Sequence, residues 1–78
     1  MMSLDQLKIG ETAHIHSLSA KDTLRRRLLD LGFVNGSTVR CLLESSAGDP
    51  RAYLIKNTVV ALRNHDAATI EISGRYQP

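Results

Sequence analysis

Hydrophobic and polar residues alternate along much of this chain, and the alternating runs are short. In residues 12–17, Ala13 and Ile15 fall on one side of an extended chain, while Thr12, His14 and His16 fall on the other. A period of two is typical of a strand with one buried face. Further strands are predicted at residues 38–44, 51–56, 58–62 and 69–72.

One segment has helical periodicity instead, between the first two predicted strands. At 100° per residue, a single narrow apolar stripe is formed by Leu24, Leu28 and Leu31. The sequence Ser19-x-x-Asp22 resembles a capping box at the start of this helix, and Gly32 stands just past its expected end at Leu31. The pattern therefore predicts a helix of about three turns.

The connections between the predicted strands limit the possible folds. They are too short for parallel crossovers, which need a dozen or more residues. We therefore expect one domain, a mainly β antiparallel barrel of about five strands with the helix inserted after the first. Residues 3–7 and 64–68 should form single helical turns, and residues 74–78 a flexible tail. The predicted core comprises Leu24, Leu28, Val39, Cys41, Val60, Leu62, Ile70 and Ile72.

Composition excludes several classes of protein. With 78 residues, the chain has little room for a deep catalytic cleft. A net charge of +2 is far below that of a dedicated nucleic-acid binder. The single cysteine, Cys41, cannot form an internal disulfide. No apolar run is long enough for a signal peptide or a membrane span, so we expect a cytoplasmic protein without direct membrane insertion.

The triplet Arg25-Arg26-Arg27 is the most conspicuous charged feature. Consecutive arginines on a helix point in different directions, and Asp22 and Asp30 stand four residues from Arg26 on either side. Both facts argue against a phosphate-binding surface. Leu29 lies off the apolar stripe, next to Arg25. It could tuck under a loop, with the Arg25 stem over the apolar surface, or the pair could form a docking surface.

Two other groups could carry chemistry. His14 and His16 could contribute to a transition-metal site, although two imidazoles leave the coordination shell incomplete. Gly48-Asp49-Pro50 could be a functional loop or simply a tight turn, in which the three residue types have separate structural roles. No spacing suggests a catalytic triad or a phosphate-cradling loop, so we expect no enzymatic activity.

Four stretches of the chain together resemble ferrous iron transport protein A (FeoA). They are "SLDQLKIGE", "LRRRLLDLGFVNG", "GDP" and "VVALRNHDAATIEI". The resemblance implies an SH3-like barrel in the bacterial cytoplasm that accompanies the membrane ferrous iron transporter, which carries a cytosolic GTP-binding domain. The family pattern covers Leu24, Arg26, Arg27, Leu28, Leu29, Gly32, Gly36, Gly48, Asp49, Pro50, Ala61, Leu62 and Arg63.

Two functions follow from this resemblance. The first is an adaptor that binds the cytosolic part of the iron transporter and modulates uptake, with no required cofactor. Its expected contact residues are Arg25, Arg26, Leu29, Gly48, Asp49 and Pro50. The alternative is a regulatory module that binds Fe²⁺ or Zn²⁺ weakly through His14 and His16, because a similar domain closes some iron-dependent repressors. A peptide-binding SH3 domain proper is disfavoured, since aromatic residues are few and scattered.

Overall fold

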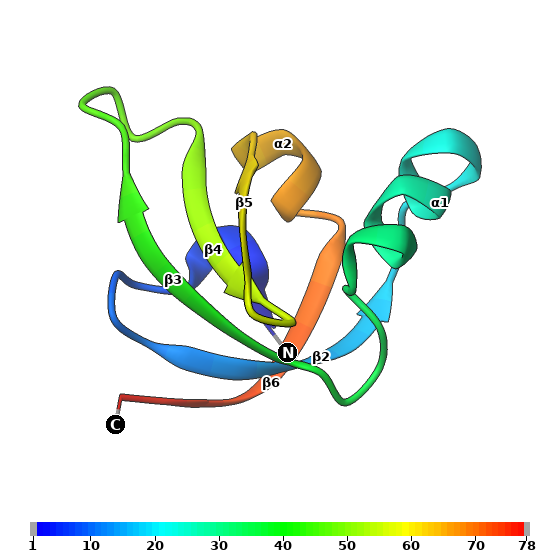
Figure 1. Ribbon diagram of the computed structural model, residues 1–78, viewed down its shortest axis with the longest axis horizontal. Coiled ribbons are helices and arrows are strands. Elements are labelled where there is room, and N and C mark those ends of the chain that lie inside the picture. Colours follow the sequence, from blue (N-terminus) through cyan, green and yellow to red (C-terminus); the bar gives the residue numbers. More distant parts are fainter. Residues whose placement is uncertain (1, 78) are drawn as a thin grey trace.

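The computed structural model describes residues 2–77, which form one antiparallel sheet with three short helical segments (Figure 1). The elements are β1 (Met2–Ser3), the 3₁₀ turn η1 (Leu4–Gln6), β2 (Thr12–Leu18), α1 (Asp22–Leu31), β3 (Thr38–Glu44), β4 (Arg51–Ile55), β5 (Thr58–Leu62), α2 (Asn64–Ala67) and β6 (Ile70–Tyr76). The strand order is β1-β6-β2-β3-β4-β5. Within residues 2–77, no helix has the length and apolar character needed to cross a membrane.

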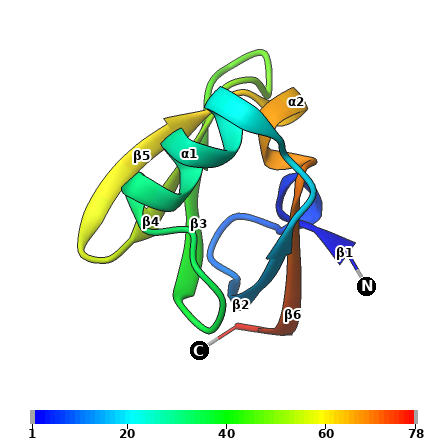
Figure 2. The same cartoon turned by 90° about the vertical axis from the view of Figure 1, so that its right-hand side faces the viewer.

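The sheet curves around a single aliphatic core, from β5 on one side to β1 on the other (Figure 2). The predicted inward faces are confirmed: Val39, Cys41, Leu62 and Ile70 are buried, as are the other predicted core residues except Leu24. Leu24 is half-buried and packs against the edge of this core. The core also includes large side chains from the predicted turns and from β4, namely Leu4, Leu7, Phe33 and Tyr53.

The C-terminal segment differs from the sequence-based prediction. Residues 74–76 are not a tail, because β6 continues to Tyr76, which lies opposite Thr12 of β2. Gly74 has a φ of +66° beside a register shift in this pairing, so the glycine permits a bulge where it was expected to end the strand. The two-residue strand β1, paired with β6, raises the number of strands within residues 2–77 to six. Pro78 lies outside the described residues.

Helix α1 begins and ends by different means. The capping box expected at Ser19 is absent: the N-cap is Lys21, and the Ser19 hydroxyl donates instead to the Thr69 carbonyl, 3.3 Å away. Ser19 is therefore part of the sheet connection rather than of the helix. The end of the helix is as predicted, because Gly32 adopts a left-handed conformation with a φ of +110° and its N–H returns to the last turn.

The turn between β4 and β5 places two non-glycine residues in the left-handed region. Lys56 and Asn57 have φ values of +50° and +62°, the pattern of a type I′ hairpin turn. Strand β4 consequently ends at Ile55, one residue before the predicted end. The Lys56 stem lies against Gly32, where an added Cβ would come within 2.6 Å of the Lys56 Cγ. The hairpin and the end of α1 are thus packed together.

Candidate functional site

The solvent-facing side of α1 presents the residues that the sequence singles out for docking. Leu28 is buried beneath the helix, whereas Leu29 is 36% exposed and lies outside the core cluster. Arg25 and Arg26 are exposed on the same helix. The Arg25 Nη1 donates to the Leu18 carbonyl at 3.1 Å, which fixes this side chain beside the end of β2. The structure therefore places an exposed leucine beside arginines on one element.

The charges on α1 are arranged differently from the sequence-based expectation. Among the described residues, no ion pair joins Arg26 to Asp22 or to Asp30. Arg27 instead reaches α2, where its Nη2 lies 3.8 Å from the Asp66 Oδ2. An exposed pair of this length contributes little to stability. Its main consequence is geometric, because it links α1 to α2. Arg26, which has no such partner among the described residues, is exposed to solvent.

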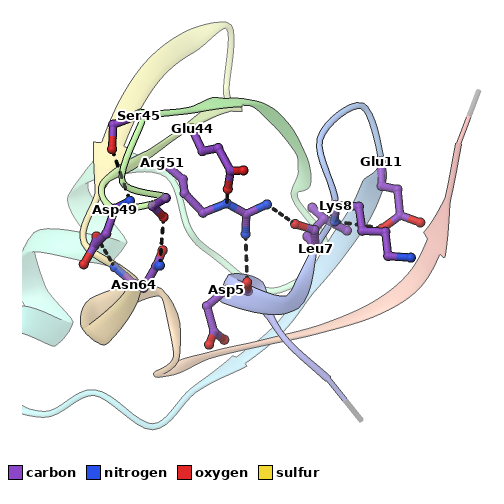
Figure 3. Close-up of polar contacts among 10 residues, drawn as sticks. Asp5, Leu7, Lys8, Glu11, Glu44, Ser45, Asp49, Arg51 and Asn64 are labelled. Carbon is purple, nitrogen blue, oxygen red and sulfur yellow. Dashed lines mark hydrogen bonds and ion pairs between the residues drawn. The ribbon is translucent and has the colours of Figure 1, made fainter.

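Gly48, Asp49 and Pro50 form the loop before β4, and polar bonds tie this loop to α2 (Figure 3). The Asn64 backbone N–H donates to the Asp49 Oδ1 at 2.9 Å, and the Asn64 Nδ2 donates to the Gly48 carbonyl at 3.0 Å. The Asp49 N–H donates to the Ser45 Oγ at 3.1 Å. Asp49 therefore satisfies a free N–H at the start of a helix. These bonds support the structural interpretation of the loop.

Arg51, the residue after this loop, is a buried cation that sequence reasoning missed (Figure 3). Its side chain is 7% exposed. Its Nη1 donates to the Asp5 carbonyl at 2.8 Å, and its Nη2 donates to the Leu7 carbonyl. The Nε lies 3.5 Å from the Glu44 carboxylate. No local sequence pattern predicts that Arg51 is a buried donor, because the carbonyls that it bonds lie more than forty residues earlier in the chain.

The arginine also sits beside a buried phenol. The Arg51 guanidinium carbon lies 5.8 Å from the centroid of the Tyr53 ring, within the range of a cation–π contact. The Tyr53 hydroxyl is fully buried and has no hydrogen-bond partner among the described residues. Burial raises the pKa of Tyr53 to about 12, and the nearby guanidinium opposes only part of this shift. Tyr53 therefore stays neutral at physiological pH.

The two histidines of the possible metal site have different neighbours. The exposed His14 ring lies beside Tyr76, with centroids 6.4 Å apart. The His16 Nε2 lies 3.8 Å from a Glu71 oxygen, at a point where the pairing of β2 with β6 is irregular. Within residues 2–77, no three His, Cys, Asp or Glu side chains are grouped so that they could hold a metal ion. The residues present therefore do not form a closed metal site.

Cys41 adds no ligand to this pair. It is fully buried in the core, on the inner face of β3. Burial raises the pKa of the Cys41 thiol, and the Arg51 charge offsets part of this effect. Metal binding and nucleophilic chemistry both need the thiolate, which this environment disfavours. Cys41 is consequently a core residue, as the strand pattern predicted.

Comparison with known proteins confirms the resemblance seen in the sequence. A family model described as the FeoA domain matches residues 2–74. Over 71 residues, the chain is 37% identical to an Fe(2+) transport protein A/Fe(2+) transporter FeoB fusion protein of Porphyromonas gingivalis. The match covers 91% of this chain but 8% of that relative, so the chain spans only a small part of the fusion protein.

Solved structures agree on the fold. The crystal structure of Stenotrophomonas maltophilia FeoA complexed with zinc, an SH3 domain protein, matches with a TM-score of 0.88 at 29% identity, covering 99% of this chain and 98% of that one. A manganese-dependent transcriptional repressor matches with a TM-score of 0.82 at 20% identity, covering 92% of this chain and 40% of that one. At this identity the likeness to the repressor concerns the fold alone. The predicted SH3-like architecture is confirmed.

Proposed function

This chain belongs to the FeoA domain family, and on that premise we propose that it is a non-catalytic cytoplasmic accessory protein of ferrous iron uptake. It binds the cytosolic GTP-binding part of the membrane iron transporter and modulates transport. The observation that carries this proposal is the Porphyromonas relative, in which a similar domain and the transporter FeoB share one chain. Fusion keeps two parts at a high effective concentration, which favours a functional contact between them.

The outer side of α1 is the proposed contact surface for the transporter. Leu29 supplies exposed apolar area, and Arg25 and Arg26 surround it with charge. A leucine flanked by arginines can be desolvated at the centre of an interface while the guanidinium groups remain at its rim. The residues of this surface are exposed and do not belong to the core, whereas Leu28 is the residue of α1 that is fully buried. The surface can therefore change without unfolding the domain.

A matched pair of leucine variants tests this contact. Leu29→Ala should weaken binding to the transporter's cytosolic domain by at least ~1–2 kcal/mol, the scale of an interface hot spot. Leu43→Ala is the control, because Leu43 is also exposed but lies on β3. Both variants should melt close to wild type. Isothermal titration calorimetry with the purified cytosolic domain gives the affinities. Equal affinities for wild type and Leu29→Ala would rule out the helix face.

Arg25 needs a separate measurement, because its bond to the Leu18 carbonyl also has a structural role. Because this bond is exposed to solvent, its loss is expected to cost no more than a typical hydrogen bond, about 1 kcal/mol of stability. Arg25→Ala should therefore lower both binding and, slightly, the melting temperature. If the arginines bound nucleic acid instead, affinity for nonspecific DNA would fall steeply with salt and would depend on all three arginines.

A second candidate function is a transition-metal-binding regulatory module that uses His14 and His16. It is favoured by one observation, the zinc in the Stenotrophomonas FeoA crystal structure. The geometry of this chain supplies at most two imidazoles, which have different neighbours. Binding of Zn²⁺ or Fe²⁺ by a single copy is therefore expected to be weak, and the adaptor function is the preferred proposal.

A further inference from the structure

Five residues on the outer face of the sheet form a continuous row across five strands. Tyr76 lies opposite Thr12, Thr12 opposite Arg40, Arg40 opposite Leu54, and Leu54 opposite Val59. Residues directly opposite one another on neighbouring strands share a face of the sheet. The neighbours of Arg40 on β3 and of Leu54 on β4 are buried in the core, namely Val39, Cys41, Tyr53 and Ile55, so the middle of this row faces away from the core. We call these five residues the outer row.

Three of the five residues of the outer row are apolar, whereas Thr12 is buried and Arg40 is charged. Val59 is 63% exposed and Tyr76 is 48% exposed, and both are among the few large hydrophobic side chains left in solvent. Leu54 is half-buried between them. Isolated exposed apolar residues need no explanation, but a set aligned along one row of a sheet is the makeup of a contact surface.

A groove of about 480 Å³ runs along this row. It is lined by Thr12, Arg40, Leu54 and Tyr76 of the outer row and by Ser37, Thr38, Lys56 and Asn57. Arg40 and Lys56 are exposed, and in the part of the chain that the structure describes neither forms an ion pair. Among residues 2–77, no carboxylate lines the groove. Its two charges are therefore both positive and available.

The acid nearest in sequence to this groove is already engaged. Glu11 precedes Thr12, but one of its oxygens accepts the Lys8 N–H at 2.9 Å and the other lies 3.7 Å from the Arg75 Nε. Lys56 is held at the groove by its left-handed backbone and by the packing of its stem on Gly32. A lysine in this conformation costs about 1 kcal/mol relative to an extended one. The fold thus fixes the backbone of Lys56 and the start of its side chain beside the groove.

We propose that the outer-row groove binds an extended acidic segment of a protein partner, in which Asp or Glu and apolar residues take turns at every second position and so share one face of the segment. The carboxylates pair with Arg40 and Lys56, and the guanidinium can hold one of them through two parallel hydrogen bonds. The apolar residues cover Leu54, Tyr76 and Val59. A small anion would satisfy the two cations but would leave this apolar row exposed, so a peptide matches the surface better. This site is separate from the proposed α1 contact and does not depend on the transporter.

A labelled peptide with the repeat Glu-Ser-Val-Ser places glutamate and valine on one face of an extended chain, and it tests the proposal by fluorescence anisotropy. Wild-type protein should bind it saturably, with an affinity that falls as salt is added. The double variant Arg40→Gln, Lys56→Gln should bind about tenfold more weakly. The control Lys8→Gln, Lys21→Gln removes the same charge from exposed residues outside the groove and should bind like wild type. Val59→Ser should weaken binding several-fold.

Four results would overturn the proposal. An equal loss in both double variants would mean that binding follows net charge rather than the groove. Equal binding of a lysine–valine peptide, or no saturable binding, would exclude an acidic ligand. Binding of phosphatidylglycerol vesicles through Arg40 and Lys56 without peptide binding would assign the groove to a membrane surface. If the groove variant does not fold, amide shifts in wild-type protein decide, and they should be confined to Thr12, Tyr76 and residues 37–40 and 54–59.

Discussion

Replacing Arg51 by Met should cost more stability than any other single charge removal in this domain. The guanidinium is buried and donates to the carbonyls of Asp5 and Leu7. A hydrogen bond from a charged group is worth ~1.5–3 kcal/mol, so the two lost bonds amount to about 3–6 kcal/mol. Relief of the buried charge offsets part of this, because desolvation of a guanidinium is itself costly. We expect a net loss of about 2–4 kcal/mol against a total of ~5–8.

Urea unfolding followed by circular dichroism measures this loss. For a domain of this size with a slope of about 1 kcal/mol per molar, the midpoint should fall by about 2–4 M. Arg26→Met is the matched control on an exposed site, where the change should stay within ~0.5 kcal/mol. Arg51→Lys should lie between the two, because an ammonium cannot span both carbonyls. An Arg51→Met protein within ~1 kcal/mol of wild type would refute this role of the guanidinium.

Three further predictions concern the core, the histidines and the buried phenol. Leu28→Asp should unfold the domain, because an unpaired carboxylate in an aliphatic core costs several kcal/mol, and a folded, monodisperse variant would contradict the packing described. Calorimetry should give micromolar or weaker affinity for Zn²⁺, and a tight one-to-one site lost in His14→Ala would instead favour the metal-binding function. Burial raises the pKa of Tyr53 to about 12, above the ordinary value of about 10. As pH rises, the phenol therefore ionises in the unfolded chain before it ionises in the folded one. The stability that the neutral phenol contributes is complete below about pH 10 and is lost as pH rises toward 12. Urea titrations should show wild type losing up to ~2–3 kcal/mol more than Tyr53→Phe across this window, and parallel losses would exclude the phenol as the cause.

Local pattern was sufficient to predict most of the fold. The inward faces of β3 and β5, the apolar stripe of α1 and the glycine at its end are all encoded within a few residues of where they act. The misplaced features depend on distant partners. Ser19 was expected to cap a helix but bonds to Thr69, and Gly74 was expected to end the fold but lies in a strand paired with β2. The residues around Ser19 do not indicate that it will bond to Thr69, and those around Gly74 do not indicate that its segment will pair with β2.

The candidate site shows the same division between local and distant information. The helical wheel places Leu29 off the apolar stripe but leaves open whether it lies under a loop or in solvent, and the structure has it 36% exposed. The burial of Arg51 does not follow from any pattern, since an arginine at the start of a strand is normally at the surface. Only the approach of η1 to the start of β4 supplies the carbonyls that satisfy it. Charged residues paired with distant backbone groups are therefore the ones that sequence reasoning misses.

The effect of the Gly48-Asp49-Pro50 loop on transporter binding has to be distinguished from that of the α1 surface before either is assigned as the contact. Asp49 holds the Asn64 N–H at the start of α2, and Asp66 of the same short helix pairs with Arg27 of α1. A substitution at Asp49 can thus change the position of α2 and, through the Arg27–Asp66 ion pair, that of α1, even if the loop contacts no partner. Arg27→Ala removes only the ion pair between α1 and α2. If Asp49→Ala and Arg27→Ala weaken transporter binding equally, the loop acts through the helix. If only Asp49→Ala weakens it, the loop itself makes the contact.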